Sequence, residues 1–235
     1  MNYFFNNFRK FYDYILTEND NLSYDEWYDK TQNIPNILVQ KKNFLSKKDI
    51  NFLLKYYKNN KNSISKDTGD LYLQDDISNK YYNKLIKIAN DNGLHEVYKD
   101  TMIISNTRYN TAVGQHYDNC KIDNNGKIIR NHSAFRTFTA TVSLTNDFTG
   151  GELYITKSRN DKKFIKIKEE LGEAISFTSN IDHKHYVTPL KSGERFRLLI
   201  WLHYKPSIFR LNKNIYIIIL ILIIIIYALY KFIRI

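Results

Sequence analysis

The chain has 235 residues and a formal net charge of +11, with 43% hydrophobic, 25% charged and 15% aromatic residues. This length allows one substantial hydrophobic core plus an appendage, and the 19 Tyr and 14 Phe exclude a chain that is disordered throughout. The single cysteine, Cys120, excludes an intramolecular disulfide and, with it, the small disulfide-stapled scaffolds of extracellular proteins.

The first part of the chain is expected to be helical. Residues 1–35 carry apolar and aromatic residues at helical spacing, which predicts one amphipathic helix packed on the main domain. These residues are Phe4, Phe5, Phe8, Phe11, Tyr12 and Ile15. A strand is expected over residues 36–40. Ser46 and Asp49 have the spacing of a capping box and predict a helix after them, and the apolar stripe of residues 76–90 predicts another.

From about residue 101 the pattern changes to that of short β-strands separated by Gly and Asn turn signals. Strands are expected over residues 102–109, 135–145, 152–156, 163–167, 173–178, 184–189 and 195–204. Helices followed by about seven strands predict an α+β fold whose sheets close into a sandwich or jelly roll.

The sharpest change in composition is near the end of the chain. Residues 215–230 carry no charge and are flanked on both sides by Lys and Arg, which predicts a C-terminal transmembrane helix. The alternative is a buried core helix, but a small domain would then have to cover an apolar surface on all sides. No signal peptide is evident at the N-terminus, so we expect a single-pass membrane anchor with the catalytic domain in the cytosol.

These patterns divide the chain into four expected parts. They are a helical extension (1–35), a catalytic domain (36–206), a basic juxtamembrane linker (207–214) and a transmembrane tail anchor (215–233).

One set of residues has the composition of a metal site. His116 and Asp118 alternate, so at a strand end they project to the same side, and His185 lies on another predicted strand. Two His and one carboxylate form the facial triad of non-haem Fe(II) oxygenases, which leaves room for a 2-oxo acid and O₂. An isolated H-x-D is also common by chance, as a strand-end His beside a solvated Asp. Zinc fits the ligand types too, although no cysteine cluster supports a structural zinc site.

A bound 2-oxo dicarboxylate needs a cation at its far end. Arg195 follows His185 by ten residues and offers a bidentate guanidinium. Arg197 has the same strand parity and is the alternative. Taken alone, either arginine is more often a surface residue.

Five motifs then follow one another in a characteristic order. They are a strand and capped helix (37–50), Arg108-Tyr109, Gly-Gln-His-Tyr-Asp (114–118), Leu-Thr-Asn-Asp-Phe-Thr-Gly-Gly-Glu-Leu (144–153) and H-x-V-x-P-x-x-x-G-x-R (185–195). In this order they resemble the prolyl 4-hydroxylase-like branch of the 2-oxoglutarate- and Fe(II)-dependent dioxygenases. The resemblance spans roughly residues 36–204.

The resemblance implies a double-stranded β-helix, or jelly roll, with N-terminal supporting helices. It also implies that His116, Asp118 and His185 bind Fe(II), and that Arg195 binds the 5-carboxylate of 2-oxoglutarate. His183 lies two residues before His185 but does not match the phase of the motif, so it is interpreted as a neighbour. No catalytic residue beyond the metal centre is implied.

The rest of the expected pocket comes from the strands near these ligands. Thr139 and Thr141 share a strand face that would look toward the cosubstrate, and Tyr109 is a further candidate contact to 2-oxoglutarate. Trp201 matches an aromatic residue near the substrate pocket of the family, although a core tryptophan explains it equally well. The implied cofactors are Fe(II), 2-oxoglutarate and O₂, with ascorbate as reductant.

The function implied is hydroxylation of a protein side chain, above all a prolyl residue, with succinate and CO₂ as co-products. The expected partners are a proline-containing protein or peptide and, through the anchor, a membrane. Nucleic acid is not an expected partner, because lysine is scattered along the chain rather than gathered into a stripe. The alternatives are a dioxygenase acting on lysyl residues or nucleic acid, and a membrane-anchored binding module with an inactive dioxygenase fold.

Overall fold

The structure is a computed structural model that describes residues 22–204, so the expected helical stripe between residues 4 and 15 lies outside the described residues. Residues 26–204 form one compact unit. The helices of the described residues are α2 (Tyr24–Thr31), α3 (Lys47–Asn59), the short 3₁₀ helix η1 (Lys61–Ser63) and α4 (Asp75–Asp91).

The strands form two sheets and two short pairs. They are β1 (Leu38–Lys41), β2 (Asp70–Tyr72), β3 (Val97–Thr107), β4 (Val113–His116), β5 (Cys120–Ile122), β6 (Ile128–Arg130), β7 (Arg136–Ser143), β8 (Thr149–Gly150), β9 (Leu153–Ile155), β10 (Ile165–Lys166), β11 (Ala174–Thr178), β12 (His185–Val187), β13 (Leu190–Ser192) and β14 (Arg195–Tyr204).

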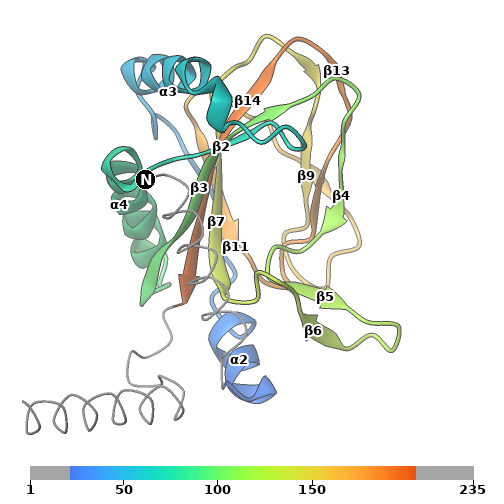
Figure 1. The fold of residues 1–235 in the computed structure, drawn as a ribbon. Coiled ribbons are helices and arrows are strands. Elements are labelled where there is room, and N and C mark those ends of the chain that lie inside the picture. Colours follow the sequence, from blue (N-terminus) through green and yellow to red (C-terminus); the bar gives the residue numbers. More distant parts are fainter. Residues whose placement is uncertain (1–21, 205–235) are drawn as a thin grey trace, which may run out of the picture. The chain divides into compact units, whose positions relative to one another are not determined.

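The two helices expected after residue 45 are present. Ser46 caps α3, since its hydroxyl accepts a hydrogen bond from the Asp49 amide while the Asp49 carboxylate accepts one from the Ser46 amide. Helix α4 spans Asp75–Asp91, one residue longer at each end than expected. Both helices lie on the same face of the large sheet (Figure 1).

The large sheet has the order β1-β11-β7-β14-β3-β2, and its neighbours run antiparallel. Strand β14 lies between β7 and β3 and follows the alternation of a strand that is covered on both faces. Its even-numbered residues, such as Leu198 and Ile200, belong to the core that also contains Leu53 of α3 and Leu85 of α4. Its odd-numbered residues therefore face the second sheet.

The second sheet has the order β10-β9-β12-β4 and lies on the side of the large sheet opposite the helices (Figure 1). In it β12 pairs antiparallel with both β4 and β9. A smaller core of Leu153, Ile155, Ile167, Ile175 and Phe177 fills the space between the two sheets. The expected β-rich jelly roll with supporting helices is thus confirmed.

Several strand limits differ from those expected. β3 begins at Val97 rather than at residue 102, because the far end of β14 extends the pairing to Val97 opposite Tyr204. The charged residues Lys99 and Asp100 interrupt the apolar alternation there. The hairpin of β5 and β6 was not expected, because each of its strands has only three residues, too few to show an alternating pattern.

The expected C-terminal transmembrane helix has to be corrected. No helix within residues 22–204 is both long enough and apolar enough to cross a bilayer, and the predicted segment (215–233) lies outside the described residues. The longest described helix, α4, has 17 residues and a charged face, whereas a span needs about 20 predominantly apolar residues. The described residues therefore form a β-rich jelly roll without a transmembrane helix, and the expected single-pass membrane anchor is not supported.

Candidate functional site

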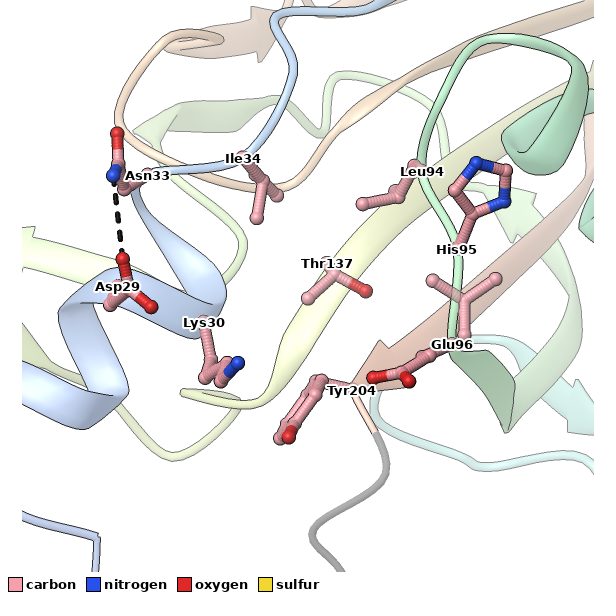
Figure 2. A pocket seen from close by; sticks show the side chains of 10 residues that line it. Asp29, Lys30, Asn33, Ile34, Leu94, His95, Glu96, Thr137 and Tyr204 are labelled. Carbon is pink, nitrogen blue, oxygen red and sulfur yellow. Dashed lines mark hydrogen bonds between the residues drawn. The ribbon is translucent and has the colours of Figure 1, made fainter.

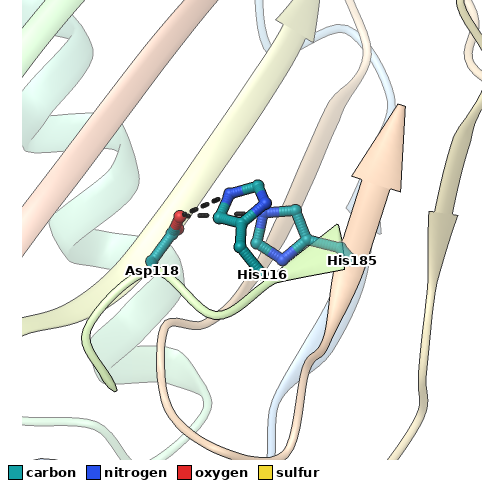
Figure 3. Close-up of side chains that lie close together, drawn as sticks. All are labelled: His116, Asp118 and His185. Carbon is teal, nitrogen blue, oxygen red and sulfur yellow. Dashed lines mark ion pairs between the residues drawn. The ribbon is translucent and has the colours of Figure 1, made fainter. Parts of the chain in front are cut away.

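Three potential metal ligands meet between the two sheets. His116 is the last residue of β4, Asp118 follows it in the next turn, and His185 is the first residue of β12. The antiparallel register places His185 directly opposite His116, and their ring centroids lie 4.2 Å apart. Figure 3 shows both rings beside the Asp118 carboxylate. Residues 69 positions apart in the chain are thus brought together by strand pairing.

The ligand atoms are close enough to share one ion. The Nε2 atom of His116 lies 3.5 Å from Oδ1 of Asp118, and that of His185 lies 3.6 Å from the same oxygen. All three ligand atoms lie within 4.8 Å of one another. Two imidazole nitrogens and one carboxylate oxygen are the donor set of the facial triad.

Backbone carbonyls fix which ring nitrogen of each histidine can bind a metal. Nδ1 of His116 lies 2.8 Å from the carbonyl oxygen of Gly114, and Nδ1 of His185 lies 3.0 Å from that of His183. A carbonyl oxygen can only accept a hydrogen bond, so each Nδ1 carries the proton and each Nε2 keeps its lone pair. Both Nε2 atoms face Asp118, which is the orientation that a shared metal requires.

The large sheet orients the carboxylate. Thr139 of β7 donates a hydrogen bond from its hydroxyl to Oδ2 of Asp118, and Nε1 of Trp201 on β14 donates to the same oxygen at 3.3 Å. Oδ1 then faces the imidazoles. The carboxylate is therefore arranged to bind a metal through one oxygen while the other is held by the sheet.

The electrostatics of the three groups suit metal binding. Burial acts to raise the pKa of Asp118, but His185, His116 and the Thr139 hydroxyl hold that pKa below its usual value. Burial lowers the pKa of His185. Burial also acts to lower the pKa of His116, but the hydrogen bond and charge of Asp118 raise it overall. At neutral pH the carboxyl group is ionised and His185 is neutral, as metal ligands must be.

A buried amide network that sequence reasoning missed supports this end of the site. Gln32, fully buried just after α2, donates from Nε2 to Oδ1 of Asn119 at 2.9 Å, and its Oε1 accepts from the amide of Ile181 at 3.0 Å. The carbonyl of Gln32 also accepts from Nδ2 of Asn180 at 3.2 Å. Asn119 directly follows the ligand Asp118, and the other two precede His185 in the chain. Gln32 thus ties together the segments that carry two of the ligands.

Both candidate arginines are buried on the inner face of β14. The exposed fraction is 6% for Arg195 and 1% for Arg197. Nη1 of Arg195 donates to the Thr107 hydroxyl at 3.0 Å, and Nη2 of Arg197 forms an ion pair with Oε2 of Glu169. Burial lowers the pKa of Arg195 to about 10 and that of Arg197 to about 9, so both remain charged at neutral pH.

Glycine makes room for Arg195. A Cβ atom on Gly151 would lie 2.6 Å from Cδ of Arg195, and Gly151 has a φ of +64°. A residue with a side chain would therefore be strained and would also push the arginine aside.

The other predicted site residues lie in different surroundings. Thr141 is buried on the same strand face as Thr139. Tyr109 is 74% exposed and forms an isolated bridge with Leu190, so the structure does not bring it into the buried pocket. The Nδ1 atom of His183 lies 2.9 Å from the Thr156 carbonyl oxygen, and His183 is not among the three grouped ligands. The predicted roles of Thr141, Tyr109 and Trp201 toward cosubstrate and substrate stay predictions.

A separate cavity of about 260 Å³ lies between α2, the connection from α4 to β3, and the ends of β7 and β14 (Figure 2). Asp29, Lys30 and Glu96 line it, so its charges are of both signs. The hydroxyl of Thr137 in its wall has no hydrogen-bond partner among the described residues. None of the three grouped ligands or the two arginines lines this cavity, so it is distinct from the candidate site.

The residues present fit Fe(II) and 2-oxoglutarate. Lys and Arg within the described part of the chain form no ion pair with Asp118, so the buried carboxylate has only the two imidazoles as its near charge partners. Three buried guanidinium nitrogens, Nε of Arg195 and Nε and Nη1 of Arg197, have no hydrogen-bond partner among the described residues. A carboxylate ligand would satisfy such donors.

Comparisons with known proteins agree with this geometry. Residues 104–203 match the 2OG-Fe(II) oxygenase superfamily. Prolyl 3-hydroxylase 3 of Homo sapiens is 28% identical over 95 residues, which cover 39% of this chain and 13% of that protein. This chain therefore spans a small part of that relative's length.

Solved structures share the fold. The viral collagen prolyl hydroxylase of Paramecium Bursaria Chlorella virus-1 superposes with a TM-score of 0.55 at 18% identity, over 72% of this chain and 96% of that chain. A prolyl hydroxylase from Trichoplax adhaerens, in complex with a peptide fragment of the hypoxia inducible factor oxygen degradation domain, gives 0.54 at 15% identity, over 71% and 83% of the two chains. The resemblance predicted from the motifs is confirmed: residues 104–203 match the 2OG-Fe(II) oxygenase superfamily, and the chain shares its fold with solved prolyl hydroxylases.

Proposed function

We propose that this chain is a 2-oxoglutarate- and Fe(II)-dependent dioxygenase that hydroxylates prolyl residues of a protein or peptide, at the 4-position of the ring. The observation that carries the proposal is the meeting of two imidazole nitrogens and one carboxylate oxygen within 4.8 Å, inside a 2OG-Fe(II) oxygenase domain. This donor set leaves half of an octahedral coordination sphere for cosubstrates.

Each residue of the site has a distinct part in this reaction. His116, Asp118 and His185 would hold Fe(II) through Nε2, Oδ1 and Nε2. When bound, Fe(II) supplies the redox chemistry by which 2-oxoglutarate and O₂ give succinate and CO₂ while one oxygen atom enters a substrate C–H bond. Arg195 would bind the distal carboxylate of 2-oxoglutarate with a charge-assisted hydrogen bond.

The surrounding residues fix the geometry and limit water. Thr139 and Trp201 hold the second oxygen of Asp118, so the first can face only the metal position. The side chains of Asp118 and His185 are 7% and 9% exposed. His116, at 39%, is the most exposed ligand and marks the side from which a substrate would approach.

The choice of a prolyl substrate is supported by the kinds of protein to which the chain is similar. The curated relative is a prolyl 3-hydroxylase, and the two solved structures are prolyl hydroxylases, one of them bound to a peptide. The 4-position follows from the motif resemblance. The proposed 4-position differs from the 3-position that is named for prolyl 3-hydroxylase 3.

The proposal is tested with the full-length chain, Fe(II), 2-oxoglutarate, ascorbate as reductant and a panel of proline-containing peptides. We expect succinate in proportion to peptide that has gained one oxygen atom, and hydrolysis of the product should yield 4-hydroxyproline. Peptides with alanine in place of proline serve as controls, and His185→Ala should give neither product. Succinate formation with 3-hydroxyproline would contradict the position. Tight binding of 2-oxoglutarate without turnover of any peptide would favour an inactive binding module.

A further inference from the structure

We propose that Glu169 sets the charge of the pocket that binds the distal end of the cosubstrate, and thereby selects cosubstrates with a single distal carboxylate. This inference rests on the proposed function. It concerns three buried side chains, Arg195, Arg197 and Glu169, which we call the arginine pocket.

The two arginines lie on one face of β14, two residues apart. Glu169 reaches them from the connection between β10 and β11, and its side chain is 8% exposed. Oε2 of Glu169 forms an ion pair with Nη2 of Arg197 and lies 4.0 Å from Nη2 of Arg195. The ring of Phe148 lies 6.0 Å from both guanidinium carbons and closes the pocket with an apolar wall.

The charges in this pocket do not balance. Two guanidinium groups face one carboxylate, so one positive charge remains without a partner of opposite sign. Arg197 is in contact with Glu169, whereas Arg195 is at the longer distance, so the unbalanced charge lies mainly on Arg195. A buried, uncompensated charge is costly, and an anionic ligand with one negative charge at this point would remove that cost.

The hydrogen-bond inventory leads to the same ligand. Nε of Arg195, Nε and Nη1 of Arg197 and Oε1 of Glu169 are buried and lack a hydrogen-bond partner among the described residues. The three unpartnered guanidinium atoms are donors, and a carboxylate offers enough lone pairs to accept from them. Oε1 of Glu169, as an acceptor, would repel a ligand that carried further negative charge.

The position of the pocket suits the far end of a short dicarboxylate. Trp201, which contacts Asp118, lies on the same face of β14 as Arg197 and Arg195, because the three residues alternate with the core residues of that strand. The arginine pocket therefore discriminates cosubstrates by the charge at their distal end, while their 2-oxo acid end would bind the metal.

The test compares two cosubstrates that differ in distal charge. One is 2-oxoglutarate, and the other is 2-oxo-4-phosphonobutyrate, whose distal phosphonate carries a second negative charge at pH 8. Binding is measured by isothermal titration to the full-length chain loaded with Mn(II), which binds such ligands without turnover. We expect the wild type to prefer the carboxylate. Glu169→Gln should shift the ratio of the two dissociation constants toward the phosphonate by about 10-fold or more, which is the effect of one close charge pair.

Glu170→Gln is the matched control. It removes the same charge one residue away, where the side chain is 48% exposed and pairs with Lys42 at 3.6 Å. We expect its ratio to stay close to that of the wild type. An equal shift in both variants, or no shift in Glu169→Gln, would overturn the proposal.

The double variant Glu169→Gln, Arg197→Gln covers the case in which the single variant does not fold. It removes one charge of each sign and keeps the net charge of the pocket, so we expect it to retain the preference for the carboxylate. Loss of that preference would overturn the proposal and shift the binding role to Arg197. Failure of the Mn(II)-loaded wild type to bind either ligand would instead refute the proposed function, and the inference with it.

Discussion

The candidate site has two ends: the metal end, formed by His116, Asp118 and His185, and the arginine pocket. They differ in how many of their polar atoms have hydrogen-bond partners within the protein. At the metal end, both Nδ1 atoms and the second oxygen of Asp118 have protein partners. In the arginine pocket, four buried polar atoms have no partner among the described residues. The metal end is therefore built as a rigid frame for geometry, whereas the arginine pocket keeps hydrogen-bonding capacity for a ligand.

This contrast predicts that changes at the metal end abolish the reaction, while changes in the arginine pocket alter cosubstrate binding. Asp118→Asn should reduce succinate release by about 1,000-fold or more, because a neutral amide is a poor ligand for the metal on which the reaction depends. The iron content of the dialysed protein should fall with it. Asp91→Asn on the exposed end of α4, where Asp91 pairs with Lys87, is the control. An Asp118→Asn variant that keeps its iron and activity would refute the assignment of the metal end.

Arg195→Ala should act at the other end. We expect the KM for 2-oxoglutarate to rise by about 10- to 100-fold with a smaller change in kcat, because a charge-assisted hydrogen bond to the cosubstrate is lost. Steady-state kinetics with varied 2-oxoglutarate measure this, with Lys191→Ala on exposed β13 as the control. An unchanged KM would mean that Arg197 is the main anchor.

The hydrogen bonds that support the metal end include those of Gln32, which lies in a segment without any candidate ligand. Gln32→Ala leaves the amide of Ile181 and the Oδ1 atom of Asn119 without their partners, and it should lower the free energy of unfolding by about 2 kcal/mol. Asn33→Ala is the matched control, since Asn33 is exposed and its Nδ2 donates to Oδ1 of Asp29 at 3.4 Å. Urea unfolding of both variants compares them. Equal losses would show that Gln32 contributes no more than any residue of this segment.

The smallest effect is expected from the neighbouring threonines of β7. Thr139→Val removes the donor to Oδ2 of Asp118 and should weaken metal affinity by about 10-fold. Thr141→Val keeps that donor and should change metal affinity less. Titration with Mn(II) distinguishes the two. A larger effect at Thr141 would contradict the assignment of Thr139 as the residue that orients the carboxylate.

The three residues of the candidate metal site were predictable because their signal is local. His116 and Asp118 alternate along one stretch, and His185 sits at the start of a motif with several fixed positions. The β-rich fold followed from the change of period near residue 101. Both signals depend on neighbours within a few residues, and such patterns survive in a single sequence.

The residues that contact the candidate ligands and arginines could not be predicted, because their positions depend on contacts between segments that are distant in the sequence. Glu169 lies in a run of lysines and glutamates that is typical of an exposed surface. Only the pairing of β10 and β11 with their neighbouring strands brings its side chain next to the arginines of β14. Gln32 and Asn119 are uncharged amides in loops, without any periodic pattern. Tyr109 fits the motif, yet it is 74% exposed, because sequence spacing does not determine the direction of a side chain beyond the end of β3.

The position of α2 has a consequence for how this protein can be divided. Trp27 of α2 is fully buried, and its Nε1 donates to the carbonyl of Ala134 at 2.8 Å. The family match begins at residue 104 and the expected domain boundary lies at residue 36, but a fragment begun at either point would lose this indole. It would leave a hole of tryptophan size beneath the loop that leads into β7. The smallest part of the chain that we expect to fold around the candidate metal site therefore begins before Trp27, well outside the segment that matches the family.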